Sequence, residues 1–314
     1  MKGLLVKRVK KEIADDKLRW TMTEKQKTQW VLRLWRRLGR IPLRRLYKLS
    51  DFLAWVVRDV VRYRRDVVDH NLEIAFPELT KEERQKVAKD FYSYFCDLIL
   101  EAPRMMTWSE EEMKEHITFE GIEQILEDAA GGRNFTLYIG HYGQWEWIPS
   151  IALWLPGVTC AQIYSQLHDP VSDKVILANR QAHGSKSVEM RDTLRYILSA
   201  SQSGKPFGVG YVADQSPSSD KLHHYIDFFG RQVPTHVGAE KITRRLGLSA
   251  YFLDMHRERR GYWRVRVVEM PYDMEDDQGD FSLTQQFYVL LEEMIRREPA
   301  YYLWSHKRFK YEKR

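Results

Sequence analysis

The chain has 314 residues, of which 43% are hydrophobic and 30% charged, and its formal net charge at pH 7 is +6. This is the composition of a globular protein with one large or two small domains, and it excludes a largely disordered or collagen-like chain. There are only two cysteines, Cys96 and Cys160, so we expect reduced thiols and no zinc site of the CxxC type. The opening residues MKGLLVKRVKKEIADDK lack the apolar core and cleavage site of a secretory signal, so none is expected.

The basic charge is concentrated between Thr28 and Arg65, where eleven Lys and Arg residues oppose two acidic ones and give +9. Apolar residues recur at helical spacing from Leu46 to Val60, and Pro42 divides the region into two helical pieces. A basic amphipathic helix that carries tryptophan is typical of an anionic membrane surface. The alternative is a helix that packs its apolar stripe on the protein and leaves its arginines in water. Nucleic-acid binding is a weaker third possibility, because no recognition motif accompanies the charge.

This segment is too often interrupted by charge to cross a membrane. Its longest uncharged piece is Phe52–Val57, whereas a spanning helix needs about 20 apolar residues. Each arginine at the bilayer centre would cost about 2.5–3.5 kcal/mol. We therefore predict a basic amphipathic segment over residues 1–65 that lies on the membrane surface, followed by a main domain over residues 66–314.

The rest of the chain alternates between helical and strand-like patterns. Thr80, followed by acidic residues, begins a helix predicted over Thr80–Met106. Alternation of this kind predicts an α/β fold with a sheet between layers of helices. The other predicted elements are strands over Phe135–Gly140, Val158–Tyr164, Pro206–Val212, Ser249–Met255 and Trp263–Val268, and helices over Asp192–Ser201, His236–Leu246 and Thr284–Arg297.

The most informative motif is Ile139-Gly140-His141-Tyr142-Gly143-Gln144-Trp145-Glu146, directly after a predicted strand. If His141 lies on the turn and Glu146 in the first turns of a following helix, the carboxylate can hold one imidazole nitrogen while the other accepts a proton. Gly143 permits close backbone approach, and free N–H groups at the start of that helix can bind an oxyanion. Gln144, in the same turn, is a candidate substrate-binding or oxyanion-stabilising residue. The spacing alone also fits a structural His–Glu pair.

Several motifs in order make the chain similar to the late acyltransferases of lipid A biosynthesis, the lauroyl and myristoyl transferases of the lysophospholipid acyltransferase superfamily. The resemblance covers about Leu43 to Lys310. The chain departs from the family's R-x-R-F-G pattern, because Ala182 and His183 replace the second arginine and the aromatic residue. The residues that carry the resemblance are Arg64-Arg65, Asn71-Leu72, Phe76-Pro77-Glu78, His141-x4-Glu146, Arg180 with Gly184, Asp214-Gln215, Phe228-Phe229-Gly230 with Pro234-Thr235, and Leu303–Lys310.

The resemblance implies an αβα layered sandwich of the glycerolipid acyltransferase type. It also implies transfer of a fatty acyl group from a thioester, on acyl carrier protein or CoA, to a hydroxyl of a lipid A precursor at the cytoplasmic face of the bacterial inner membrane. His141 would be the general base and Glu146 would orient its imidazole. Arg180 would bind a phosphate or the oxyanion, and Asp214 and Gln215 would contact substrate at the rim of the sheet. No acyl-enzyme is expected, because the thioester is already activated. We expect no metal, because the other histidines, including His223, His224 and His256, lack ligand spacing, and we expect no cofactor.

Alternatives stay open at this point. The same dyad could acylate a phospholipid or an amino-lipid, or the chain could bind lipid or acyl carrier protein without turnover. A hydrolase is a third possibility, although the usual G-x-S-x-G motif is absent. Arg180 could be a surface arginine, Asp214 a buried loop cap, and Phe228-Phe229 ordinary core instead of the lining of an acyl-chain tunnel. The segment containing Trp304, His306 and Arg308 is expected to have a structural or headgroup-binding role.

Overall fold

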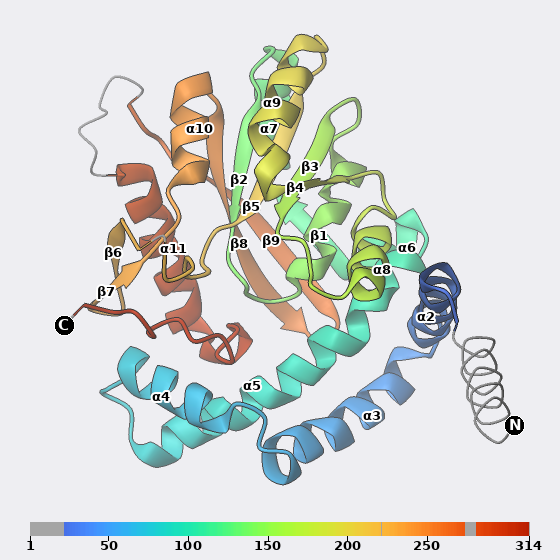
Figure 1. Ribbon diagram of the computed structural model, residues 1–314, viewed down its shortest axis with the longest axis vertical. Helices are drawn as coiled ribbons and strands as arrows, with labels where there is room; N and C mark the ends of the chain where they lie inside the picture. The colour runs from blue at the N-terminus through green and yellow to red at the C-terminus, as the bar shows by residue number, and fades with distance from the viewer. Residues whose placement is uncertain (1–21, 221, 274–280, 314) are drawn as a thin grey trace, which may run out of the picture.

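The computed structural model describes residues 22–220, 222–273 and 281–313, and a seven-stranded sheet forms its centre (Figure 1). The strands lie in the order β1-β9-β8-β2-β5-β3-β4, and neighbours pair in parallel except for β8 with β9. Helices flank the sheet, so the predicted α/β class is confirmed as a mixed α/β fold. The expectation about a secretory signal concerns residues 1–21, which lie outside the described residues. The strands of the sheet are β1 (Ile117–Glu120), β2 (Phe135–Ile139), β3 (Thr159–Tyr164), β4 (Lys186–Glu189), β5 (Phe207–Val212), β8 (Ser249–Arg259) and β9 (Tyr262–Glu269).

The central strands β2 and β5 are almost entirely buried, which explains their continuous apolar sequences. Their register pairs Phe135 with Gly208 and Ile139 with Val212. A Cβ atom on Gly208 would approach the Phe135 ring to 2.1 Å, so glycine is required for this close strand packing. The two strands therefore end at the same level of the sheet, and the residues that follow them meet there.

Most predicted helices are confirmed within a few residues. Helix α5 (Lys81–Glu101) begins with a capping box formed by Thr80 and Glu83, and its continuation over Ala102–Met106 tightens to a 3-10 helix. The segment after β2 is a turn that leads into a helix, as predicted, and this helix is a 3-10 helix over Trp145–Trp154. The sequence patterns did not reveal β1, β4 or the hairpin β6 (Tyr225–Phe228) and β7 (Arg231–Pro234). The remaining elements are α4 (Arg65–Ala75), α6 (Glu110–His116), α7 (Ile122–Ala130), α8 (Pro170–Arg180), α9 (Thr193–Gln202), α10 (Gly238–Leu246), α11 (Ser282–Arg297), and the 3-10 turns Met190–Asp192 and Pro299–Tyr301.

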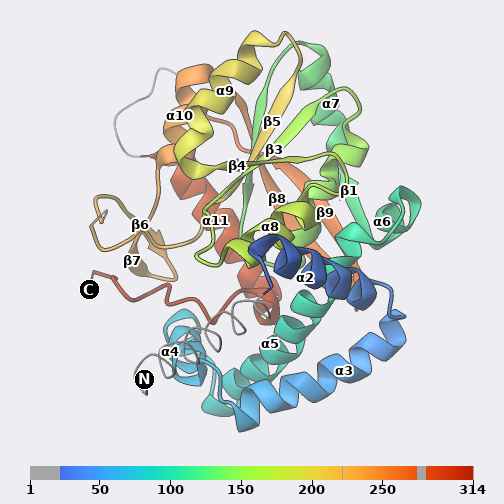
Figure 2. The same cartoon turned by 45° about the vertical axis from the view of Figure 1, so that its right-hand side comes forward.

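The basic segment forms two helices, α2 (Glu24–Gly39) and α3 (Leu43–Trp55), which separate at Pro42 as predicted. Figure 2 shows α2 beside α8 and α3 along α5, and contacts join both pairs. Leu46, Ser50 and Ala54 of α3 are buried, and the Ser50 hydroxyl donates to Asp97 Oδ1 at 2.6 Å. One face of this segment therefore packs on the protein, while the division of the chain at residue 65 stays a prediction.

The opposite face of the same helices exposes large apolar side chains among the arginines. Phe52 and Trp55 are each more than half exposed, and their rings lie 6.0 Å apart. A π-helical turn over Val56–Val60 continues α3. In the described parts of the chain, no helix combines the length and the apolar character needed to cross a membrane. The exposed apolar residues of this segment, called the N-terminal face below, are Trp30, Leu34, Leu49, Phe52, Trp55, Val60 and Val61.

The C-terminal motif contributes several buried side chains. Trp304 is inaccessible to solvent, and the buried Arg308 guanidinium donates to the Pro234 carbonyl at 2.9 Å and the Tyr288 hydroxyl at 2.7 Å. Phe228 and Phe229 pack in the same core, with the Phe229 ring 5.5 Å from that of Phe76. These positions favour a structural role for Trp304 and Arg308, and they correspond to the ordinary-core alternative for Phe228-Phe229.

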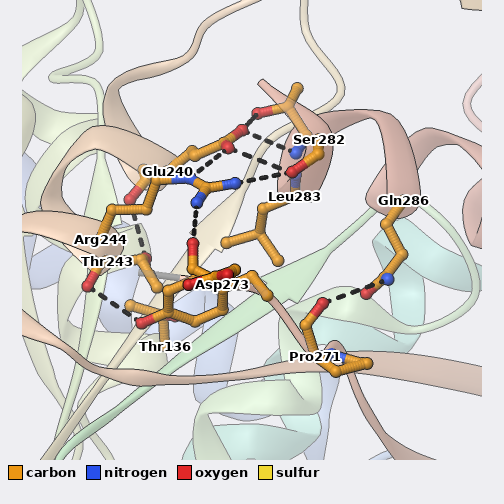
Figure 3. A network of polar contacts seen from close by, with 12 residues as sticks. Thr136, Glu240, Thr243, Arg244, Pro271, Asp273, Ser282, Leu283 and Gln286 are labelled. Carbon is orange, nitrogen blue, oxygen red and sulfur yellow. Dashed lines mark hydrogen bonds and ion pairs between the residues drawn. The ribbon is translucent and has the colours of Figure 1, made fainter. Parts of the chain in front are cut away.

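A buried carboxylate on α10 organises the start of α11 (Figure 3). Helix α11 has no capping side chain of its own, because Phe281 occupies its N-cap position. Glu240 accepts hydrogen bonds from the Thr284 N–H at 2.8 Å and from the Thr284 hydroxyl at 2.7 Å. Its other oxygen accepts from Arg244 Nε at 2.8 Å. One side chain thus accepts hydrogen bonds from the first turn of α11 and joins that helix to α10.

Replacing Glu240 with alanine is expected to lower the free energy of unfolding by about 3 kcal/mol, because it removes the carboxylate that pairs with Arg244 and leaves the buried Thr284 N–H and hydroxyl without their acceptor. Urea unfolding followed by circular dichroism measures this change. Glu293→Ala, an exposed glutamate on α11, is the control and is expected to shift stability by less than about 0.5 kcal/mol. Equal stability of the two variants would contradict this role for Glu240.

Candidate active site

His141 and Asp214 meet at the carboxyl edge of the sheet. Each lies two residues beyond its strand, β2 or β5, and the Ala213 N–H donates to the Ile139 carbonyl at 3.0 Å, which extends the pairing past the strand ends. His141 Nδ1 is 2.6 Å from Asp214 Oδ1, and the His141 backbone N–H donates to Asp214 Oδ2 at 3.2 Å. Both carboxylate oxygens of Asp214 therefore bind His141. Asp214 lies at the strand-end position predicted for it, in contact with the predicted general base.

This geometry corrects the predicted contact between His141 and Glu146. Glu146 accepts from Arg180 Nε at 2.8 Å and Nη2 at 2.6 Å, and from Trp145 Nε1 at 3.2 Å. The reason is local: the residues after Gly140 run through an irregular turn, and a 3-10 helix begins only at Trp145, so Glu146 is directed toward the end of α8. The imidazole is held by Asp214 instead.

Arg180 forms an ion pair with Glu146, so part of its guanidinium is already engaged within the protein. Two of its guanidinium nitrogens bind Glu146, so Arg180 is not a simple surface residue, and its side chain is largely buried. Burial raises the pKa of Glu146, but the charge and hydrogen bonds of Arg180, together with His141 and the Trp145 indole, outweigh burial and hold that pKa below its usual range. Glu146 is therefore anionic at neutral pH, and the pair forms a fixed bidentate unit beside the turn.

Asp214 is also kept ionised. Burial raises its pKa, but interactions with His141, followed by the charge of Arg308, lower it below the usual value. An anionic carboxylate can only accept hydrogen bonds, so His141 Nδ1 donates to Asp214, and Nε2 is the acceptor nitrogen of the neutral imidazole with this tautomer. The amide nitrogen of Gln215, an exposed residue, lies 3.0 Å from that Nε2. Gln215 thus occupies the hydrogen-bonding position at His141 Nε2.

Gln144 does not face this site. Its side chain is fully buried and donates to Glu101 Oε2 at 2.9 Å. The backbone N–H groups of Gly143 and Gln144 are engaged within the protein, since Gly143 donates to the Tyr301 carbonyl at 2.9 Å and Gln144 to Met255 Sδ at 3.1 Å. In this structure the Gln144 side chain therefore anchors the turn on α5 and points away from His141.

A cavity of about 460 Å³ lies beside the site, within the usual size range of small-molecule pockets. It extends from Glu146 and Gln215 along α5, and its walls come from segments far apart in the sequence. Most of its lining is apolar. The lining residues are Trp35, Tyr63, Arg64, Phe95, Leu98, Ile99, Ala102, Trp145, Glu146, Ile176, Gln215, Leu303, Ser305 and His306.

The sequence grouped His306 with Trp304 and Arg308 in a segment of structural or headgroup-binding role and did not single it out as a site residue. It lines the cavity, and its Nε2 accepts from the Ser216 N–H at 3.4 Å. Burial lowers the pKa of His306 to about 4, so its imidazole is neutral at pH 7. Its position in the Leu303–Lys310 motif was the available signal, but that motif alone did not indicate which side chain faces the site.

The cysteines take no part in this arrangement. Both are buried, and burial raises the pKa of Cys96 to about 11 and that of Cys160 to about 12. Neither is available as a thiolate nucleophile at neutral pH. Among the residues that the structure describes, no group of three or more His, Cys, Asp or Glu side chains could hold a metal ion.

Comparison with known proteins identifies the family. A family model described as bacterial lipid A biosynthesis acyltransferase matches residues 16–311. In Escherichia coli K12, the chain is similar to a lipid A biosynthesis palmitoleoyltransferase (23% identity, covering 89% of each chain) and a lauroyltransferase (24% identity, covering 86% of this chain and 87% of the relative). A Haemophilus influenzae lipid A biosynthesis acyltransferase is 23% identical over 66% of this chain and 64% of its own length. The resemblance carried by the motifs is thereby confirmed: the chain belongs to the bacterial lipid A biosynthesis acyltransferases and is an acyltransferase of that pathway.

Proposed function

We propose that the chain transfers a fatty acyl group from an acyl thioester, on acyl carrier protein or CoA, to a hydroxyl of a lipid A precursor, with His141 as the general base. Family membership implies the lipid A precursor as acceptor. The observation that carries the catalytic proposal is the 2.6 Å contact between His141 Nδ1 and Asp214, which leaves Nε2 free to accept a proton. The sheet flanked by helices, with His141 directly after β2, supports an αβα sandwich of the glycerolipid acyltransferase type.

In this mechanism the acceptor hydroxyl displaces the Gln215 amide from His141 Nε2. The hydroxyl oxygen attacks the thioester carbonyl as its proton passes to Nε2, and Asp214 stabilises the imidazolium that forms. The tetrahedral intermediate collapses with loss of the thiolate, which takes the proton from the imidazolium. No covalent acyl-enzyme is needed, which agrees with two buried cysteines of raised pKa.

The pair formed by Glu146 and Arg180 has a positioning role in this proposal. Trp145 donates to Glu146, and its ring lies edge-on to the His141 imidazole with centroids 5.3 Å apart. Glu146 therefore fixes both the Arg180 guanidinium and the indole that borders the base. A fixed guanidinium next to the reacting carbonyl would favour the developing oxyanion.

The test is an assay of the purified protein with each donor and a lipid A precursor, with the acylated product measured by mass spectrometry. We expect one added acyl group per transfer and release of an equal amount of free thiol. Absence of product with both acyl carrier protein and CoA thioesters would contradict the proposal. Release of free fatty acid without acylated lipid would point instead to hydrolysis.

We also propose that the protein acts at the cytoplasmic face of the inner membrane and binds that surface through the N-terminal face. Exposed Phe52 and Trp55 lie in a segment of charge +9, a combination suited to anionic lipid. Trp35, from the same segment, lines the cavity beside the site. Lipid drawn from the membrane would therefore reach the cavity without crossing a long stretch of water.

Binding to vesicles is expected to have two parts. The electrostatic part, about 1 kcal/mol per well-placed basic residue, requires anionic lipid and weakens at high salt. The apolar part should fall in a Phe52→Ser/Trp55→Ser variant and persist in Leu194→Ser/Leu198→Ser, which removes two similarly exposed residues from α9. Vesicle flotation measures both. Equal binding by all variants, insensitive to salt and lipid charge, would contradict this docking surface.

A further inference from the structure

Two arginines in the loop before α4 adopt the left-handed backbone region that favours glycine. Arg62 has φ 54° and Arg64 has φ 50°. The loop between them is held by the Tyr63 N–H, which donates to the Val57 carbonyl at 3.0 Å, and by the Tyr92 hydroxyl, which donates to the Tyr63 carbonyl at 2.8 Å. Strained backbone of this kind persists only where surrounding contacts hold it, and it is often found at binding sites.

The conformation places Arg64 on the wall of the 460 Å³ cavity, whereas Arg62 does not line it. Arg64 Nη1 donates to the Ser305 carbonyl at 2.9 Å, which fixes the guanidinium without neutralising it. Across residues 22–220, 222–273 and 281–313, no carboxylate lies within ion-pair distance of Arg64. Its positive charge is thus available to a bound anion.

The other ionisable groups of the lining leave this charge uncompensated. The negative charge of Glu146 is compensated by Arg180, which donates two hydrogen bonds to it. His306 is neutral at pH 7, because burial lowers its pKa to about 4. The rest of the wall along α5 is apolar and includes Phe95, Leu98 and Ile99. The cavity therefore combines one fixed positive charge with a long apolar surface, and it suits an anionic amphiphile.

We propose that Arg64 binds a phosphate ester of a substrate whose apolar chain occupies this cavity, and so helps to select that substrate. This inference rests on the proposed function. The acyl group is uncharged both in the thioester donor and in the ester product. The anionic group that pairs with Arg64 must therefore belong to another part of the substrate. A phosphate ester meets this requirement, and the planar guanidinium can bind two of its oxygens at once. Such a group occurs on phosphorylated lipid acceptors and on the carrier portion of thioester donors.

The test compares Arg64→Gln, Arg64→Lys and Arg62→Gln in neutral detergent micelles. The acceptors are a phosphorylated lipid A precursor and the same lipid after enzymatic removal of its phosphate. Arg64→Gln is expected to raise KM for the phosphorylated acceptor roughly 10- to 100-fold with little change in kcat, and to leave KM for the dephosphorylated acceptor unchanged. Arg64→Lys should restore part of the affinity. Arg62→Gln, which removes the same charge at the same backbone conformation, should affect both acceptors equally.

The assay also separates the two sources of phosphate. A rise in KM for the thioester donor, with the acceptor unaffected, would support the site and assign the phosphate to the donor. Unchanged KM for both substrates in a folded Arg64→Gln protein, or an equal rise with and without the phosphate, would overturn the proposal. If the wild-type protein transfers no acyl group, the proposed function fails on its own. Equilibrium binding of the phosphorylated lipid to wild type and Arg64→Gln would then still decide the role of Arg64.

Discussion

Replacing His141 with alanine is expected to lower kcat/KM for acyl transfer by about 10²–10⁴-fold, the usual contribution of a general base. The loss should appear mainly in kcat, because the acceptor hydroxyl would still bind but would have no group to take its proton. Initial rates with a thioester donor and a lipid A precursor, measured by mass spectrometry, give this value. Thermal unfolding of the variant shows whether the protein remains folded.

His256→Ala is the matched control for this experiment. His256 also binds an aspartate, with Nε2 3.2 Å from Asp254 Oδ2, but it lies on β8 and does not line the cavity beside the site. Its loss removes a histidine–aspartate contact of the same chemical kind, so the rate should stay within about twofold of wild type. A folded His141→Ala protein with the wild-type rate would end the general-base assignment.

The sequence predicted β2, β3, β5, β8 and β9 well, because buried strands have largely apolar sequences that are visible locally. It missed β1 and β4, the short strands at the two edges of the sheet. It placed His141 correctly on the turn after β2. The partner of His141 could not be found in the same way. Asp214 is 73 residues away, and only the register of β2 against β5 brings the two together. Spacing along the chain favoured Glu146 because it is near in sequence.

The directions of the side chains in the turn after β2 could not be predicted from the sequence either. Gln144 points toward α5 because Glu101 accepts a hydrogen bond from its amide, and Glu146 points toward α8 because Arg180 binds it there. Both partners come from other helices. The cavity has the same origin, since Trp35, Ile176 and His306 line it from three distant segments. Such features follow from tertiary packing, and a local pattern of residues does not contain them.

Substitutions of Asp214 and Glu146, the two candidate partners of His141, are expected to lower kcat by different amounts. Asp214→Asn is expected to lower kcat by about 10²–10⁴-fold, nearly as much as loss of the base itself. Wild-type Asp214 accepts from both the Nδ1–H and the backbone N–H of His141, one on each oxygen. Asparagine has only one oxygen, so either the backbone contact is lost or an amide N–H faces Nδ1. In the second case the imidazole proton moves to Nε2, which can no longer act as a base.

Glu146→Gln is expected to have a smaller effect, about tenfold, because glutamine keeps one acceptor for Arg180 and loses only the charge of the pair. Measurement of kcat and KM for both single variants and for His141→Ala/Asp214→Asn separates the roles. The double variant should be no slower than His141→Ala alone, since residues that act as a unit are not additive. A large kcat loss in Glu146→Gln with near-normal Asp214→Asn would instead return the orienting role to Glu146. That result would require the turn after β2 to rearrange when substrate binds, because in this structure the imidazole hydrogen-bonds to Asp214.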